Sequence, residues 1–144
     1  MFSRACEYGI RSLIFITMKS IKGDRMNLTE ISQAIDSPPA FTAKILQKLV
    51  KGNIVTSIKG PNGGFEISKE AIKRVRLSHV VEIIDGDSVY KACGIGLDEC
   101  NALRPCPLHD RFTAVRSELK EMLEETTLKE LSKRLDNGGA FLKM

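Results

Sequence analysis

The sequence lacks any long uninterrupted apolar run. Its apolar patch near the start, Leu13 to Ile16, is bordered by Arg11, Lys19 and Lys22 and is too short to span a membrane. No small-residue cleavage site follows it, so a secretory signal is not indicated either. These absences predict a cytoplasmic protein without a membrane partner. Because cysteines stay reduced in the cytoplasm, the four cysteines favour metal binding over disulfides.

Recognisable catalytic elements are also scarce. The glycine-rich segment 60–64 reads GPNGG, but neither GKS nor GKT follows it and no helix opens immediately behind it, so it is not a nucleotide-binding loop. A cysteine paired with a histidine can serve as nucleophile and base in an enzyme. Here no oxyanion element accompanies such a pair, and the cysteines cluster instead of standing alone. The sequence therefore does not indicate an enzyme.

The charges are distributed unevenly along the chain. The 144 residues suit one domain, or one small domain with an oligomerising extension, and 42% apolar with 28% charged residues is typical of a folded protein. Residues 1–80 carry 13 Lys and Arg against 6 Asp and Glu, whereas residues 81–144 carry 9 against 12. A basic first half suggests a polyanion as the partner of that half only.

The first half shows the pattern of a helix-turn-helix. Helical spacing of apolar residues predicts a helix over 4–21. A second helix is predicted to start at Asn27, with a capping box formed by the acid three residues later. Ser37 as cap and Pro38 at the first helical position predict a third helix, which runs to about Lys51. Two short helices joined by a tight turn form a helix-turn-helix, although this segment alone equally permits a plain helical hairpin.

The third helix has a predicted apolar face and a predicted outward face. The apolar face begins at Phe41 and includes Leu49. The outward face is small and basic, and it consists of Ala40, Thr42, Ala43, Lys44, Gln47 and Lys48. Small and basic residues on the outward face of this third helix suit close approach to a polyanion.

A β-hairpin is predicted directly after the third helix. Residues 54–58 are rich in β-branched side chains and residues 65–67 alternate, with Asn62-Gly63 as the turn between them. A hairpin in this position is a wing, and its glycine-rich tip with Lys59 can approach phosphates or a minor groove. The predicted fold class is therefore mainly α with a small β-hairpin, a winged helix-turn-helix, with residues 1–85 as the DNA-binding region.

Residues 86–144 are predicted to hold a cysteine loop, a long helix and a short tail. Two short helices, 68–75 and 78–84, precede this region. Apolar residues then recur at steps that average 3.5 residues, which predicts a long C-terminal dimerisation helix, with an intramolecular seam as the alternative. The repeating residues are Leu108, Phe112, Val115, Leu119 and Met122, and Leu128, Leu131 and Leu135 predict a last short helix.

Three of the four cysteines and one of the two histidines lie within one short segment. They have the spacing Cys-x6-Cys-x5-Cys-x2-His, formed by Cys93, Cys100, Cys106 and His109. A structural zinc knuckle usually has paired Cys-x2-Cys steps, whereas these longer gaps suit a larger iron–sulfur cluster. Zinc, reduced structural thiols and a disulfide remain alternatives. Cys6 is predicted to be a buried helix residue.

With the wing, the cysteine loop and the long helix in view, the chain resembles the bacterial winged-helix family of the iron–sulfur cluster regulator IscR and the nitric-oxide-sensitive repressor NsrR. The likeness runs from about residue 2 to residue 135. It is carried by EYGIRSL (7–13), IVTSIKGPNGGF (54–65), CPLH (106–109) and TTLKEL (126–131).

The resemblance implies a cofactor, two partners and a set of ligands. The cofactor is an iron–sulfur cluster, [2Fe-2S] or [4Fe-4S], and the partners are a second copy of the chain and a palindromic double-stranded DNA operator. The three cysteines of the loop match the family's cluster ligands. The fourth ligand is a histidine in one branch, matched by His109, and an acid of the other subunit in the other branch, matched by Glu7. The sequence carries both, and we favour His109.

The implied function is a homodimeric transcriptional regulator whose operator binding depends on a cluster that senses nitric oxide, redox or iron–sulfur status. The alternative is a winged-helix regulator that uses the same cysteines for zinc or for direct thiol oxidation. Lys59 departs from the family, since many relatives place arginine there. The predicted DNA-binding residues are Pro38, Ala40, Thr42, Lys44, Lys48, Ser57, Lys59, Gly60 and Asn62.

Overall fold

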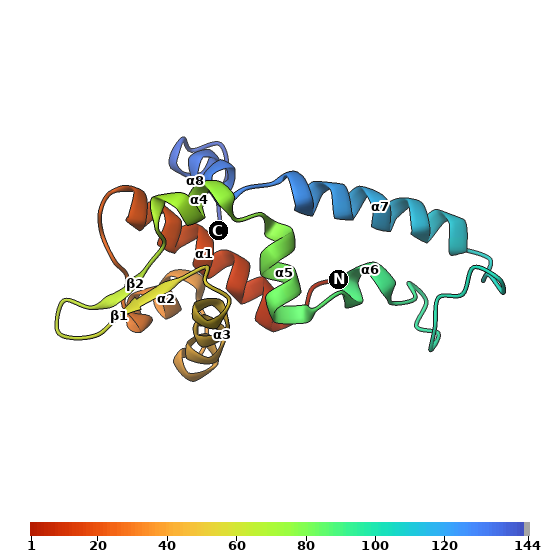
Figure 1. Ribbon diagram of the computed structural model, residues 1–144, viewed down its shortest axis with the longest axis horizontal. Coiled ribbons are helices and arrows are strands. Elements are labelled where there is room, and N and C mark those ends of the chain that lie inside the picture. Colours follow the sequence, from red (N-terminus) through yellow and green to blue (C-terminus); the bar gives the residue numbers. More distant parts are fainter. Residues whose placement is uncertain (143–144) are drawn as a thin grey trace.

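The helix α1 (Arg4–Ile21) lies at the centre of the computed structural model, which describes residues 1–142 (Figure 1). The elements around it, in chain order, are α2 (Leu28–Ile35), α3 (Pro39–Lys51), β1 (Thr56–Ile58), β2 (Gly64–Glu66), α4 (Lys69–Arg74), α5 (Leu77–Asp85), α6 (Ser88–Lys91), α7 (His109–Glu125) and α8 (Leu128–Asp136). Helices α2, α3, α5 and α8 pack against α1. No helix among the described residues is long and apolar enough to cross a membrane.

A close approach at Gly9 brings three helices together. A Cβ at Gly9 would lie 2.4 Å from the Cδ1 of Ile84 on α5 and 3.3 Å from the Cγ2 of Ile45 on α3. A side chain at this position would therefore require the end of the Ile84 side chain to move. Leu13 and Ile16, further along α1, are fully buried in the main core. The predicted apolar face is thus buried at Leu13, but its last position, Ile21, is 58% exposed.

The helix-turn-helix consists of α2 and α3. Asn27 caps α2 as predicted, because its Oδ1 accepts the Glu30 N–H at 2.9 Å. The predicted cap of α3 is wrong by one residue: Pro38 is the cap and Pro39 the first helical residue. The physical reason is that a residue before proline avoids the helical region, so Pro38 stays extended with ψ of 128°.

The prediction that Thr42 faces outwards is wrong. Thr42 is fully buried, on the same face of α3 as Ile45 and Leu49. Its hydroxyl donates to the Pro38 carbonyl at 2.9 Å and also shares a hydrogen bond with the Ser37 hydroxyl. Because these bonds satisfy the hydroxyl, a polar side chain can lie at a buried position, and polarity alone misplaced it.

The wing is the antiparallel pair β1 and β2, in which Ser57 lies opposite Phe65. Its turn is closed by the Gly63 N–H, which donates to the Gly60 carbonyl at 2.9 Å. The central turn residues are therefore Pro61 and Asn62, and not the predicted pair Asn62-Gly63. Proline is preferred at the first central position because its fixed φ matches that of a type I or II turn.

The chain before α2 lies along the wing as an additional extended segment. The Met26 N–H donates to the Phe65 carbonyl at 3.1 Å, and the Phe65 N–H donates to the Met26 carbonyl at 2.7 Å. A Cβ at Gly64, where φ is +142°, would lie 2.7 Å from the Met26 carbonyl oxygen. Glycine is thus needed where the two segments approach most closely.

In the second half, the chain leaves the body through α6 and the cysteine loop, α7 runs back to the body, and α8 packs onto it (Figure 1). Leu123 is the buried residue of α7, close to its C-terminal end. Leu128 at the start of α8 is fully buried in the main core, where α8 packs against α1. Residues on both sides of the predicted division between 85 and 86 therefore share one core. The division into regions 1–85 and 86–144 remains a prediction. The last two residues of the second region lie outside the described part of the chain.

Candidate functional site

An exposed basic face lies on α3 beside the wing. Lys44 and Lys48 are exposed on α3, and Lys59 is exposed at the start of the wing turn. A groove of about 330 Å³ separates α3 from the wing, and its lining residues are Ala43, Gln47, Val50, Lys51, Ser57 and Phe65. A helix and a hairpin that flank a groove and carry lysines provide a surface for a phosphate backbone.

Eight of the nine predicted DNA-binding residues are exposed to solvent. The exception is the buried Thr42. The structure brings Ser57 to the groove beside α3 and places Lys59 and Asn62 near the tip of the wing. The exposed set consists of Pro38, Ala40, Lys44, Lys48, Ser57, Lys59, Gly60 and Asn62. Their contact with DNA remains a prediction.

Aromatic and cationic side chains of α1 contact the end of α2 and the start of α3. The rings of Tyr8 and Phe41 meet edge to face with centroids 5.7 Å apart. The Arg11 guanidinium lies 4.8 Å from the centroid of Tyr8 and also donates to the Ile35 carbonyl at 3.3 Å. Edge-to-face and cation–π contacts of this kind favour one orientation of the partners. They fix the turn between α2 and α3 relative to α1.

The cysteine loop lies between α6 and α7, at the far end of α7 from the body (Figure 1). Cys93, Cys100 and Cys106 are free and half-buried. The Cys100 Sγ lies 3.5 Å from the Nδ1 of His109, which is the first residue of α7. The structure thus brings one predicted thiol ligand together with the predicted imidazole ligand.

The four predicted ligands are not assembled into one centre. Within residues 1–142, no group of three or more histidine, cysteine, aspartate or glutamate side chains lies close enough to hold a metal ion. The donor set nevertheless fits an iron–sulfur cluster in its chemistry, since it offers three unpaired thiols and an imidazole on one loop. Holding a cluster would require Cys93 and Cys106 to move toward Cys100 and His109.

Arg116 of α7 contacts the cysteine loop, and the sequence reasoning missed it. Its guanidinium donates to the Ala92 carbonyl at 2.8 Å and to the Cys100 Sγ at 3.1 Å. A pocket of about 490 Å³ lies beside this contact, lined by Tyr90, Lys91, Asp98, Glu99, Cys100, His109 and Arg116. No sequence signal marks this residue, because Arg116 and Ala92 are brought together only by the fold.

The thiols differ in their acidity because their surroundings differ. The pKa of Cys93 is lowered, chiefly because the backbone N–H groups of Ile95 and Leu97 stabilise the thiolate. Cys6 is fully buried, and burial raises its pKa to about 12, with the nearby Asp85 carboxylate adding to the shift. Cys6 is therefore a buried helix residue, in agreement with the sequence prediction.

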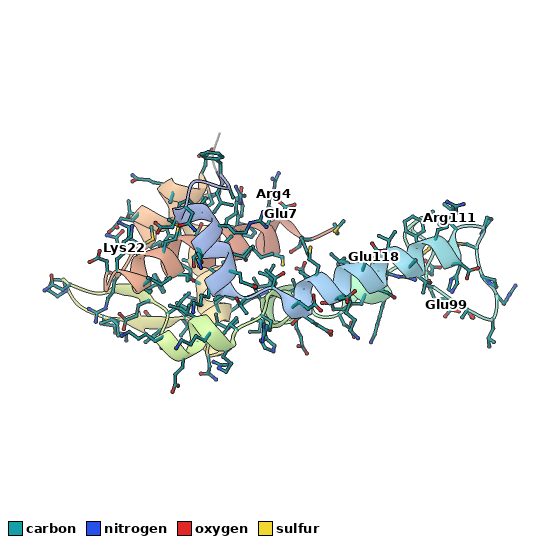
Figure 2. All side chains as sticks on the ribbon, turned by 90° about the horizontal axis from the view of Figure 1, so that it is seen from above. Arg4, Glu7, Lys22, Glu99, Arg111 and Glu118 are labelled. Atoms are coloured by element: carbon teal, nitrogen blue, oxygen red, sulfur yellow. The ribbon has the colours of Figure 1, made fainter. Side chains whose placement is uncertain are left out.

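Glu7 lies on the body of the molecule and not near the cysteine loop of its own chain. Figure 2 shows Glu7 beside Arg4, whereas Glu99 and Arg111 lie at the far end of α7. The Glu7 carboxylate is 3.9 Å from the Arg4 guanidinium, and both side chains are largely exposed. Within one chain Glu7 does not join Cys100 and His109, so a role as ligand requires a second subunit and stays a prediction.

The apolar stripe of the long helix is divided between the body and solvent. Leu119 packs with the smaller core cluster around Leu123. Leu108, Val115 and Met122 are 42%, 56% and 48% exposed. The apolar residues that recur every three to four positions therefore include some that pack within the chain and others that form an exposed apolar edge. An apolar edge on a helix that extends away from the body is a surface suited to a partner.

The helix-turn-helix with its hairpin wing defines the chain as a winged-helix protein of the DNA-binding class. Residues 2–134 match the model of the Rrf2 family, described as iron-dependent transcriptional regulators, and the chain belongs to this family. Its members are transcriptional regulators that bind DNA and not enzymes, in agreement with the sequence prediction.

The relatives in sequence are similar over most of the chain. A helix-turn-helix transcriptional regulator of Aquifex aeolicus is 28% identical, covering 91% of this chain and 90% of the relative. NsrR of Oceanobacillus iheyensis is 27% identical, with coverage of 88% and 86%. IscR of Vibrio atlanticus is 25% identical, with coverage of 88% and 71%. These matches agree with the resemblance to the family of IscR and NsrR.

Solved structures support the fold. The global cysteine regulator CymR of B. subtilis has a TM-score of 0.73 at 20% identity, covering 92% of this chain and 96% of that chain. IscR of T. potens has a TM-score of 0.72 at 14% identity, with coverage of 98% and 92%. At such low identity the likeness concerns the fold alone. The predicted winged helix-turn-helix is thereby confirmed.

The burial of Cys6 predicts selective alkylation. In native, metal-free protein at pH 8, iodoacetamide should modify Cys93, Cys100 and Cys106 and leave Cys6 unmodified, because Cys6 is buried and its pKa is about 12. Peptide mass spectrometry measures the modified fraction of each thiol. In urea all four cysteines should react. Native modification of Cys6 at the same rate as the loop cysteines would show that α1 is not packed as described.

Proposed function

We propose that this chain is a homodimeric transcriptional regulator whose operator binding is controlled by an iron–sulfur cluster. The observation that carries the proposal is the placement of three unpaired thiols and an imidazole on one loop, away from the basic face of α3 and the wing. Cys93, Cys100, Cys106 and His109 would hold the cluster, [2Fe-2S] or [4Fe-4S], with Glu7 of a second subunit as the alternative fourth ligand. When bound, the cluster supplies reactivity toward nitric oxide, oxidants or iron–sulfur status.

In this proposal, a change in the conformation of the cysteine loop changes the position of the DNA-binding face. Ligation would order residues 93–109, which run from just after α6 to the first residue of α7. Leu123 of α7 packs against Cys6 of α1 and Leu77 of α5, and α1 contacts α3 directly. A change in the loop can therefore reach α3 through packed helices. Control requires that the two states of the loop differ in their affinity for DNA, because equal affinities shift no equilibrium.

A second candidate is a regulator that uses the same cysteines for zinc or for direct thiol oxidation. The lowered pKa of Cys93 favours thiol chemistry, since the thiolate is the form that reacts with oxidants. The oxidized form of Staphylococcus aureus CymR is among the similar solved structures, with a TM-score of 0.73 at 16% identity. In this candidate the loop would switch without iron.

Anaerobic reconstitution tests the cluster and identifies its ligands. With iron and sulfide, the wild-type protein should gain visible absorbance and bind both elements, because its thiolates hold iron. Cys93→Ala, Cys100→Ala and Cys106→Ala should each abolish the absorbance. Loss in His109→Ala with retention in Glu7→Ala would assign the histidine as the fourth ligand, and the reverse would assign the acid.

Cys6→Ala is the matched control, because Cys6 is buried in the body and should not contribute. Iron-free, colourless wild-type protein after reconstitution would reject the cluster and leave the zinc or thiol candidate. Titration of labelled DNA with cluster-loaded and cluster-free protein completes the test. Equal affinities for every duplex would reject cluster control even where the cluster is present.

Lysine substitutions test the DNA-binding face. Lys44→Ala, Lys48→Ala and Lys59→Ala should each weaken DNA binding and lower the slope of log affinity against log salt by about one unit, because each removes one phosphate contact. Fluorescence anisotropy at several salt concentrations measures both quantities. Lys69→Ala, an exposed lysine of α4, is the control and should keep the slope. Unchanged slopes in all three variants would place the DNA elsewhere.

Charge placed on the exposed apolar edge of α7 tests the homodimer. The wild-type protein should sediment at about twice the 16.0 kDa chain mass, and Val115→Glu with Met122→Glu should sediment near the chain mass. A buried carboxylate in the interface would be unpaired and costly, so it should separate the subunits. Ser117→Glu, exposed on the opposite face, should remain dimeric. A dimer that persists in the double variant would exclude this edge as the interface.

A further inference from the structure

The Arg25 side chain joins the turn of the wing to its second strand. Its Nε donates to the Glu66 carboxylate at 2.9 Å, and its Nη1 donates to the Asn62 main-chain carbonyl at 3.2 Å. Glu66 lies in β2, whereas Asn62 lies in the turn. One planar guanidinium therefore fixes two points of the hairpin at once. An ammonium on a flexible stem has no comparable fork.

The wing needs such an external support. Its strands contain three residues each, and an isolated two-stranded hairpin is marginally stable in water. The main-chain pairing of Met26 with Phe65 holds the middle of β2 but does not reach the turn. Arg25 precedes Met26 in the chain, so its side chain extends the support from β2 to Asn62 in the turn.

The Arg25 contact also leaves the tip of the wing free. The bond to Asn62 uses the main-chain carbonyl, and Lys59, Gly60 and Asn62 remain exposed. An exposed ion pair adds little to global stability because solvent screens it. Its main effect is therefore local: it restricts where the tip can lie relative to α3.

We infer that Arg25 is a positioning residue for DNA binding, which holds the tip of the wing so that Lys59 meets the DNA. The inference rests on the proposed DNA-binding face. Arg25 acts through the wing and does not itself contact phosphate, because its guanidinium is engaged by Glu66 and Asn62. The residue lies outside the helix-turn-helix and the hairpin, so neither pattern identifies it in the sequence.

A double-mutant cycle separates positioning from direct contact. The probe is a labelled duplex that the wild-type protein selects from a random double-stranded library. Arg25→Met should weaken binding about tenfold, as expected for lost hydrogen bonds to a charged group. Lys59→Ala should cost no more than about twofold in the Arg25→Met background, because its contact is already lost there. Additive losses would mean that Arg25 contacts DNA independently, which would overturn the inference.

Arg25→Lys distinguishes the fork from the charge. It keeps the positive charge beside Glu66 but cannot reach both acceptors, so binding should stay weak. Full recovery in Arg25→Lys would show that only the charge matters and would overturn the inference. Arg74→Met, an exposed arginine at the end of α4, is the matched control and should bind as the wild type does.

Hydrogen exchange tests the same inference without DNA. The Gly63 N–H, which closes the wing turn, should exchange faster in Arg25→Met, whereas the amides of α1 should be unchanged. Unchanged exchange at Gly63 would overturn the positioning role. A wild-type protein that binds no duplex would contradict the proposed function as well. Wild-type binding with an unaffected Arg25→Met would contradict this inference alone.

Discussion

The close packing of α1 is the constraint on which the rest of the structure depends. Gly9 lets α1 approach α3 and α5 so closely that a Cβ would lie 2.4 Å from a side-chain carbon of Ile84. The same helix packs against α2 and α8. Because interiors are close-packed, a shift of any one of these helices must be accommodated by α1. The helix thus joins α3 to the elements that lead into the cysteine loop.

The basic face of α3 and the wing, which we propose binds DNA, is positioned by side chains that lie outside it. Tyr8 of α1 contacts the start of α3, and Arg11 donates to a carbonyl at the end of α2. Arg25 contacts the turn and the second strand of the wing. The exposed lysines provide charge, but charge alone attracts DNA without fixing its register. The contacts behind this face hold α3 and the hairpin in position. In the proposed function, these contacts would hold the basic surface in a fixed position on the DNA.

The cysteine loop is loosely packed, in contrast to α1, and it carries reactive thiols. Its thiols are half-buried, and the neighbouring Ile95, Leu97 and Leu103 are exposed. A loop with few buried contacts opens at low free energy, and elements that switch are drawn from such regions. The Arg116 guanidinium beside Cys100 provides one of the contacts that order the loop in this state. The molecule therefore combines a closely packed centre with a loosely held loop.

The sequence by itself determined the elements whose signals are local. Apolar spacing predicted the helix 4–21, β-branched runs predicted the wing, and clustered cysteines located the loop. Only the tertiary structure decided that Thr42 is buried, that Cys100 and not all three thiols lies beside His109, and that Arg25 reaches Asn62. The physical reason is range: backbone geometry sets periodicity over a few residues, whereas contacts between distant residues exist only after the helices have packed.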